Sequence, residues 1–205
     1  MKILEKKFFN RATLVVAKDL LGKYLVRRHG KKTVKYLITE VEAYDGFKDK
    51  ASHASRGMTK RNAPMFGEAG HWYVYFTYGM HWMLNIVTGM NDYPAAVLIR
   101  GVAAPLLKRG EPRPIFKIGR EGINGPGRVT KQLKIDKIFN NKIASPKTSL
   151  WIAAPTLSER ASLKNVFLSG KIKIENSPRI GVNYAGPIWS KKKWRFILIN
   201  IDKKV

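Results

Sequence analysis

The chain of 205 residues contains no cysteine. This absence excludes disulfide bonds, thiolate metal ligands and cysteine nucleophiles, and it removes the usual sequence support for a secreted protein. Acidic residues are also scarce, since 14 Asp and Glu stand against 39 Lys and Arg, for a formal net charge of +25. A charge of this sign and size indicates either affinity for polyanions or a device for solubility.

The sequence also lacks a long apolar run. The basic N-terminus is followed by Phe8 to Arg11 without a sustained apolar region, so we expect no secretory signal and a cytoplasmic location. Residues 69 to 91 contain no charged Asp, Glu, Lys or Arg, but histidines, asparagine and glycines interrupt them. A membrane span needs about 20 predominantly apolar residues, so none is expected.

The 44% of apolar residues can bury a core, and no repeat or linker divides the chain. We therefore expect one domain over residues 1–205, an α/β fold of the α+β type with a mainly antiparallel sheet. Asn10 is expected to cap a helix over residues 11–21 that Gly22 ends. The other expected elements are strands over 23–28, 34–44, 71–77, 82–88 (a hairpin with 71–77, turning near Gly79), 95–102, 150–153, 171–175 and 195–201, an exposed loop over 105–127, and a short helix over 127–133.

The basic residues leave one gap. No Lys or Arg lies between Arg61 and Arg100, and residues 66 to 82 within this gap hold seven aromatic side chains. A basic body around an uncharged aromatic segment suits a nucleic acid, with cations on phosphates and rings on bases. The alternative is that the segment is core and that the charge serves solubility, and composition leaves both open.

Several polar residues lie where an apolar strand residue is expected. The period of two places Glu40, Glu42 and Tyr44 on one face of the strand over 34–44, and a solvent-exposed face with surface ion pairs is the simpler interpretation of that strand alone. Asn85 lies among apolar residues on one face of the strand over 82–88. Arg100 follows the apolar residues 95–99 in the next strand. An unpaired buried amide costs about 1 to 3 kcal/mol. Several such departures in one small sheet favour a shared polar pocket.

Metal and cofactor motifs are not found. The spacings of His53, His71 and His81 match no common zinc pattern, and no cysteine is present to complete one. The segment Gly125-Pro126-Gly127 lacks the lysine and serine of a phosphate-binding loop. We therefore expect neither a metal nor another cofactor.

Five ordered blocks carry a family resemblance: TEVEAYDG from Thr39, SHASRG from Ser52, RNAPMF from Arg61, HWYVYFTYGMHWMLNIV from His71 and AAVLIRGVAAP from Ala95. Two weaker blocks follow, GPGRVTKQL and PRIGVNYAG. In order and approximate spacing, these blocks resemble the alkyladenine (3-methyladenine) DNA glycosylases over nearly the whole chain. The stretch after Pro105 looks shorter and more irregular than the family pattern.

The resemblance implies roles for single residues. Glu42 matches the general base that activates the attacking water, and Arg100 matches the residue that holds the flipped nucleotide near it. Tyr78 matches the side chain that enters the duplex from a protruding hairpin and fills the vacated space.

The resemblance also implies a pocket for the flipped base. Tyr44 and Tyr75 match the rings that sandwich the base, and His53 lines the same pocket. Asn85 matches the residue that crowds the amino group of a normal guanine.

The implied activity is removal of alkylated or deaminated purines from double-stranded DNA by hydrolysis of the N-glycosidic bond, which leaves an abasic site. No lysine maps onto the pocket, so we expect a monofunctional enzyme that does not cut the strand, and a monomer without a cofactor. The main alternative is a non-catalytic basic protein that binds nucleic acid. A metal-dependent hydrolase that uses the histidines and a basic membrane-surface protein are further alternatives.

Overall fold

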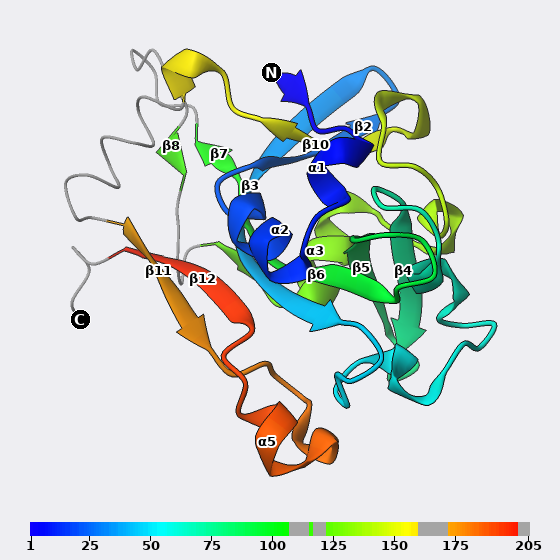
Figure 1. The fold of residues 1–205 in the computed structure, drawn as a ribbon. Helices are drawn as coiled ribbons and strands as arrows, with labels where there is room; N and C mark the ends of the chain where they lie inside the picture. Colours follow the sequence, from blue (N-terminus) through cyan, green and yellow to red (C-terminus); the bar gives the residue numbers. More distant parts are fainter. Residues whose placement is uncertain (107–114, 117–121, 160–171, 201–205) are drawn as a thin grey trace.

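An antiparallel sheet with few helices forms the body of the molecule (Figure 1). The structure is a computed structural model that describes residues 1–106, 115–116, 122–159 and 172–200. The helices and strands are β1 Lys2–Ile3, α1 Lys6–Phe9, α2 Thr13–Leu20, β2 Tyr24–His29, β3 Lys32–Asp45, β4 Trp72–Thr77, β5 His81–Val87, β6 Ala95–Ala103, β7 Pro105–Leu106, β8 Ile115–Phe116, β9 Ile123–Asn124, α3 Pro126–Leu133, β10 Leu150–Ala154, β11 Ile172–Ser177, α5 Gly186–Ser190 and β12 Arg195–Asn200.

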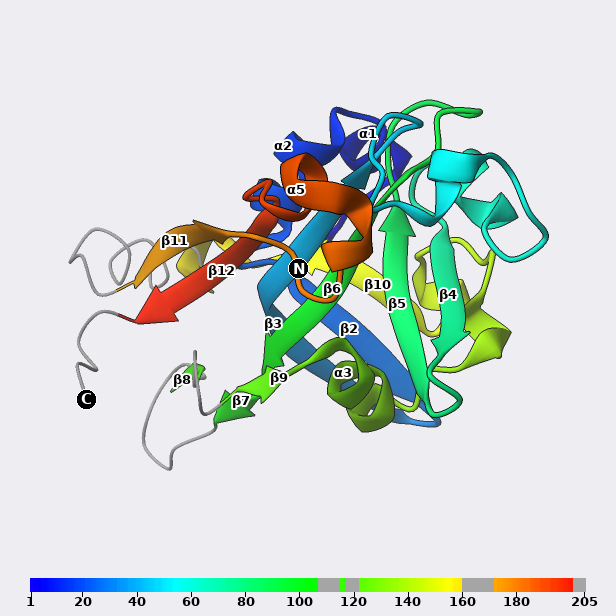
Figure 2. The same ribbon diagram turned by 90° about the horizontal axis from the view of Figure 1, so that it is seen from below.

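The sheet is organised around β3. In the described residues, ten strands share one sheet, whose main order is β1-β10-β2-β3-β6-β5-β4, and every pairing is antiparallel. The first part of β3 pairs with β2 and the later part with β12, while β6 pairs along the other edge. Figure 2 shows β3, β6, β5 and β4 side by side. The predicted α+β fold with a mainly antiparallel sheet is confirmed.

The main core joins the sheet to two helices. Val16 and Leu20 of α2 lie in the same buried cluster as Val129 of α3, and this cluster includes Ile86 and Ile99 of the sheet. Burying a side chain of this size stabilises the fold by about 1.5 to 3 kcal/mol. The described elements therefore form one compact domain. None of the described helices is long and apolar enough to cross a membrane.

The first helix differs from the prediction. Asn10 does not cap a helix over 11–21, because its backbone N–H donates to the carbonyl of Lys6 and ends the separate helix α1. This short helix forms because it buries Phe9, which is 1% exposed. The following helix, α2, begins at Thr13 with no side-chain cap. Gly22, at φ +75°, then follows its end as expected.

The aromatic hairpin was predicted within one residue at each strand end. It consists of β4 and β5, and the N–H of Met80 donates to the carbonyl of Thr77 across the turn. Tyr78 and Gly79 both have positive φ, 52° and 64°, which is the pattern of a type I′ hairpin turn. Glycine adopts such angles without cost, whereas Tyr78 is held there by the turn.

The later expectations are met in part. The predicted helix over 127–133 is α3, and the last three predicted strands correspond to β10, β11 and β12, with residues 171 and 201 outside the described part. The predicted loop over 105–127 contains β7, β8, β9 and the start of α3. The rest of that loop lies outside the described residues.

Candidate active site

A double irregularity in the pairing of β3 with β6 places the charged residues of the site. Glu40 pairs with Gly101 rather than with Arg100, so the register shifts on both sides of Glu40. A Cβ on Gly101 would lie 2.9 Å from the Cβ of Glu40, so this position requires glycine. Bulges of this kind re-aim side chains. Arg100 Nε donates to Glu40 Oε1 at 3.0 Å, and its Nη1 lies 3.4 Å from Glu42 Oε2.

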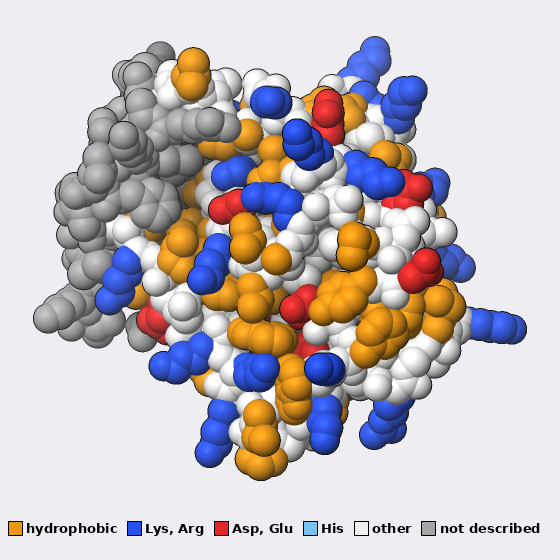
Figure 3. Space-filling view, viewed as in Figure 1, with side chains coloured by type: hydrophobic (Ala, Val, Ile, Leu, Met, Phe, Trp, Pro, Cys, Tyr) orange, Lys and Arg blue, Asp and Glu red, His pale blue; other side chains and the backbone are white. Residues whose placement is uncertain are grey.

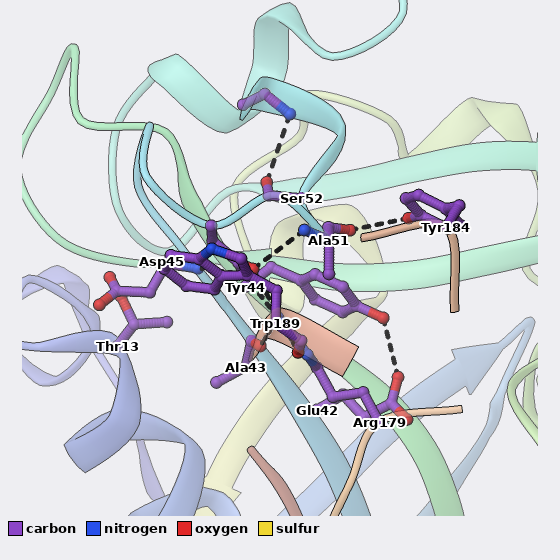
Figure 4. Close-up of polar contacts among 12 residues, drawn as sticks. Thr13, Glu42, Ala43, Tyr44, Asp45, Ala51, Ser52, Arg179, Tyr184 and Trp189 are labelled. Atoms are coloured by element: carbon purple, nitrogen blue, oxygen red, sulfur yellow. Dashed lines mark hydrogen bonds and ion pairs between the residues drawn. The ribbon is translucent and has the colours of Figure 1, made fainter. Parts of the chain in front are cut away.

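The carboxyl group of Glu42 is buried and well supplied with donors. Its side chain has no exposed surface. Oε1 accepts from the backbone N–H of Ile180 at 2.8 Å, and Oε2 accepts from the hydroxyl of Tyr44 at 2.9 Å, a contact drawn in Figure 4. Burial raises the pKa of Glu42, while Arg100, the Ile180 N–H and the Tyr44 hydroxyl act in the opposite direction.

The simpler interpretation of the β3 acids was therefore wrong. Glu40 is only 8% exposed and Glu42 is fully buried, so neither belongs to a solvated face. Glu40 Oε1 receives a second guanidinium, from Arg195 at 3.1 Å, as well as that of Arg100. The shared polar pocket that the sheet's odd residues favoured is the correct interpretation.

A cavity of about 280 Å³ lies directly beside Glu42. All three donors to the carboxyl group, Tyr44, Arg100 and Ile180, line it, although Glu42 itself does not reach its wall. The structure thus brings together every residue selected from the sequence, with six of them on the cavity wall: Tyr44, His53, Tyr75, Tyr78, Asn85 and Arg100.

Aromatic side chains form one wall of this cavity. The Tyr75 ring lies 5.1 Å from the Tyr73 ring and 4.7 Å from the His53 ring, measured between centroids. His53 Nδ1 is 3.1 Å from the Tyr73 hydroxyl, and Arg61 lies over the Tyr75 ring at 5.1 Å. Burial raises the pKa of both tyrosines, and burial followed by the charge of Arg61 lowers the pKa of His53. The wall is therefore uncharged at neutral pH.

Asn85 has the partners that its apolar neighbours led us to expect. Its side chain is 3% exposed, and Nδ2 donates to the carbonyl of Tyr73 at 3.0 Å and to that of Met83 at 3.5 Å. These bonds fix the amide in one orientation at the cavity wall. The expectation that this buried amide is hydrogen-bonded is confirmed.

One structural pair was missed by the sequence reasoning. Arg179 and Asp49 are both fully buried and form a two-pronged ion pair, with N–O distances of 2.5 and 2.8 Å. Arg179 also donates to the carbonyl of Ala43 at 2.9 Å and lies 4.8 Å from the centre of the Tyr44 ring. The pair thereby holds the segment that carries Ile180 against Glu42. The weak PRIGVNYAG block was the only signal for it in the sequence.

Comparison with known proteins shows the family of the chain. A model of the family described as methylpurine-DNA glycosylase matches residues 7–201. The chain belongs to this family of DNA glycosylases. A provisionally named 3-methyladenine DNA glycosylase of Methanocella arvoryzae is 40% identical over 206 residues, which cover 96% of this chain and 92% of that protein.

Two bacterial relatives give similar values. A protein of Ehrlichia chaffeensis with the same provisional name is 39% identical over 199 residues, with 96% of this chain and 93% of that protein covered. Its counterpart from Sodalis glossinidius is 40% identical over 196 residues and covers 95% of each chain. The similarity to members of this glycosylase family therefore extends over almost the full length.

The histidines of this family member do not gather around one point. Among the described residues, no three His, Asp or Glu side chains are placed to hold a metal ion. His53 belongs to the cavity wall, while His71 Nδ1 lies 3.1 Å from the backbone carbonyl of Glu68.

Proposed function

We propose that the chain is a DNA glycosylase that extrudes an alkylated purine from double-stranded DNA and hydrolyses its N-glycosidic bond. The observation that carries the proposal is a fully buried carboxyl group, Glu42, whose three donors all line one aromatic cavity. The provisional names of the relatives state 3-methyladenine as the base that those proteins act on. In this proposal, residues 1–205 act as a single glycosylase domain and as a monomer.

The cavity would receive the extruded base. A base inside a duplex is out of reach of an enzyme, and damaged bases cost least to unstack. We assign Tyr44 and Tyr75 as the rings that enclose the base, with His53 at its edge. Alkylation at a ring nitrogen gives a purine positive charge, and the neutral phenol rings attract such a base by about 0.5 to 2 kcal/mol. Normal neutral purines gain less.

Glu42 would act as general base. A carboxylate can accept about four hydrogen bonds, and the protein supplies three, so one acceptor site is left for water. The water gives its proton to Glu42 as its oxygen bonds to C1′ of the deoxyribose. The bond from C1′ to the base breaks and its electron pair leaves with the base. One carboxylate suffices because the cationic base is a good leaving group.

Three further residues would select and hold the nucleotide. Arg100, paired with both Glu40 and Glu42, would hold the flipped nucleotide beside the base catalyst. Asn85 lies at the cavity wall, where its amide, fixed by the bonds to the Tyr73 and Met83 carbonyls, would crowd the amino group of a normal guanine. Tyr78, which is 78% exposed at the hairpin tip, would enter the duplex and fill the vacated space.

The test is release of free base from duplex DNA treated with a methylating agent, compared with untreated duplex. We expect base release only from the methylated duplex, with the strand left intact until alkali is added. None of the described residues that line the cavity is a lysine, so borohydride should trap no covalent adduct. Binding without any base release would favour the second candidate, a non-catalytic nucleic-acid-binding protein, which the net charge of +25 also suits.

A further inference from the structure

A second hollow opens beside the base cavity. It is a groove of about 940 Å³, and it shares His53 and Tyr184 with the base cavity, so the two hollows lie side by side. We call it the basic aromatic groove. Its lining residues are Phe47, Lys48, Lys50, Ser52, His53, Ser55, Arg56, Tyr184 and Trp189.

The cations of the groove are free to bind an anion. Lys48, Lys50 and Arg56 are exposed, and none of the described acidic side chains lies within ion-pair distance of them. The acid between the two lysines, Asp49, turns inward and is neutralised by Arg179. Residues 47–56 therefore expose three positively charged side chains to solvent, while their one acidic side chain is buried.

Aromatic rings supply the rest of the groove. Phe47 is 52% exposed and Tyr184 is 68% exposed, while Trp189 is half-buried. The Tyr184 hydroxyl donates to the carbonyl of Ala51 at 2.9 Å, which fixes one wall to the other and is visible in Figure 4. Figure 3 shows Lys and Arg side chains around hydrophobic ones at the end of the molecule where α5 lies.

We propose that the basic aromatic groove binds the damaged DNA strand immediately beside the extruded nucleotide, on one side of it. Phosphates would lie on Lys48, Lys50 and Arg56, and a sugar or base would lie against the exposed rings. Rings and cations along one groove are the usual means of holding a single nucleic-acid strand. This inference rests on the proposed function, because a nucleotide in the base cavity brings its neighbours to the shared residues His53 and Tyr184.

The experiment removes the three charges together, in the variant Lys48→Ala/Lys50→Ala/Arg56→Ala. The matched control is Lys31→Ala/Lys32→Ala/Lys147→Ala, which removes three exposed lysines that line neither hollow. The control positions are on the β2–β3 turn and ahead of β10, at the end of the molecule opposite α5 (Figure 1). Binding to a duplex with one methylated purine is measured over a range of salt, in a Glu42→Gln background that preserves the substrate.

We expect the groove variant to bind at least about tenfold more weakly than the control near 0.1 M salt, with the slope of log K against log salt smaller by about 2 to 3. Single methylphosphonates, which neutralise one phosphate each, are then placed along the damaged strand. Methylphosphonates next to the lesion on one side should weaken binding by the chain that keeps Lys48, Lys50 and Arg56. The same methylphosphonates should have no effect on binding by the groove variant.

Two outcomes would overturn the inference. Equal binding and equal salt slopes for the groove variant and the control variant would do so, as would a methylphosphonate pattern that the groove variant does not change. Either outcome would show that the groove does not bind the damaged DNA strand. Failure of the proposed function looks different, because the unsubstituted chain would then release no base and would not prefer methylated duplex.

Discussion

The carboxyl group of Glu42 is subject to two opposing effects. Burial disfavours its ionised form, while Arg100, Tyr44 and the Ile180 N–H favour it, and the net result is a raised pKa. A general base works best when its pKa lies near the working pH. The same burial that destabilises the ionised carboxylate therefore makes it a stronger base than a surface glutamate.

The raised pKa predicts the acid side of the pH profile. Base release needs ionised Glu42, so its rate should fall as the pH drops through the folded-state pKa, at a midpoint above the ordinary carboxyl value of 4.5. The contribution of Glu42 to folding stability changes with pH in the opposite direction to the rate. Because the folded state favours the protonated form, the contribution of Glu42 to stability is greatest below 4.5 and declines as the pH rises through the raised pKa. Single-turnover rates measured from pH 4 to pH 8 test this, and a midpoint at or below 4.5 would contradict it.

The buried ion pair of Arg179 with Asp49 allows a second prediction. In Asp49→Asn, Arg179 would keep a buried charge without its counter-ion, which costs about 3 to 5 kcal/mol. The matched control is Asp19→Asn, because Asp19 pairs with Arg11 at the surface, where such a pair contributes about 0 to 1 kcal/mol. Urea denaturation measures both changes.

A positioning role would add an effect beyond stability. Displacement of the Ile180 segment removes a donor from Glu42, so the acid midpoint of the Asp49→Asn pH profile should shift upward under conditions where the variant is folded. A purely structural role would lower the stability and leave that midpoint in place.

At the scale of the elements, the irregular pairing of β3 with β6 decides where Arg100 points. In Gly101→Ala, the new Cβ would meet Glu40 at 2.9 Å and force the strand or the ion pair to move. Overpacking of this kind costs about 1 to 3 kcal/mol. We expect this loss in thermal denaturation together with slower base release. The control Gly67→Ala, whose Cβ would meet its nearest atom at 3.4 Å, should have little effect, and equal behaviour of the two variants would contradict the account.

The β4–β5 hairpin makes a different prediction, because its tip is exposed. Tyr78→Ala should impair base extrusion and slow base release, while the free energy of unfolding changes by no more than about 0.5 kcal/mol, as is usual for surface substitutions. Met90→Ala is the control, since Met90 is 72% exposed and lines neither hollow. A large loss of stability in Tyr78→Ala would show that the ring packs in the core instead.

Local patterns predicted those elements whose cause is local. The hairpin follows from alternating aromatic residues around a Tyr-Gly turn, and the end of α2 follows from Gly22. The burial of Glu42 could not be predicted from its own strand, because the covering N–H comes from Ile180, 138 residues later in the chain. The buried Arg179 was missed for the same reason, since Asp49 lies 130 residues away.

The prediction of where α2 begins was wrong for a different reason. Asn10 is a good capping residue, and the helical period begins directly after it, so the two signals agreed. The packing of Phe9 into the core instead formed a separate turn of helix ahead of Asn10. Tertiary burial therefore overrode a correct local preference.

At the scale of the whole molecule, the site exists only in the folded chain. Its buried carboxyl group comes from β3 and its guanidinium group from β6. Its rings come from β3, β4, the β4–β5 turn and residues 53–56, and its covering segment comes from residues 178–184. The surrounding surface is strongly basic, with a net charge of +25 for the full sequence. In the proposed function, this basic body would concentrate DNA at its surface, and the buried carboxyl group beside the cavity would carry out the reaction.

In the proposed function, Glu42 performs the chemistry and does not merely support the fold. Glutamine keeps the size of the side chain and an oxygen for the Ile180 N–H, and the Tyr44 hydroxyl can accept from the new amide. The decisive measurement is therefore release of free base from methylated duplex by Glu42→Gln and by the unsubstituted chain, with duplex binding measured in parallel. We predict that Glu42→Gln binds methylated duplex normally and releases no base, whereas release at an undiminished rate would contradict the account.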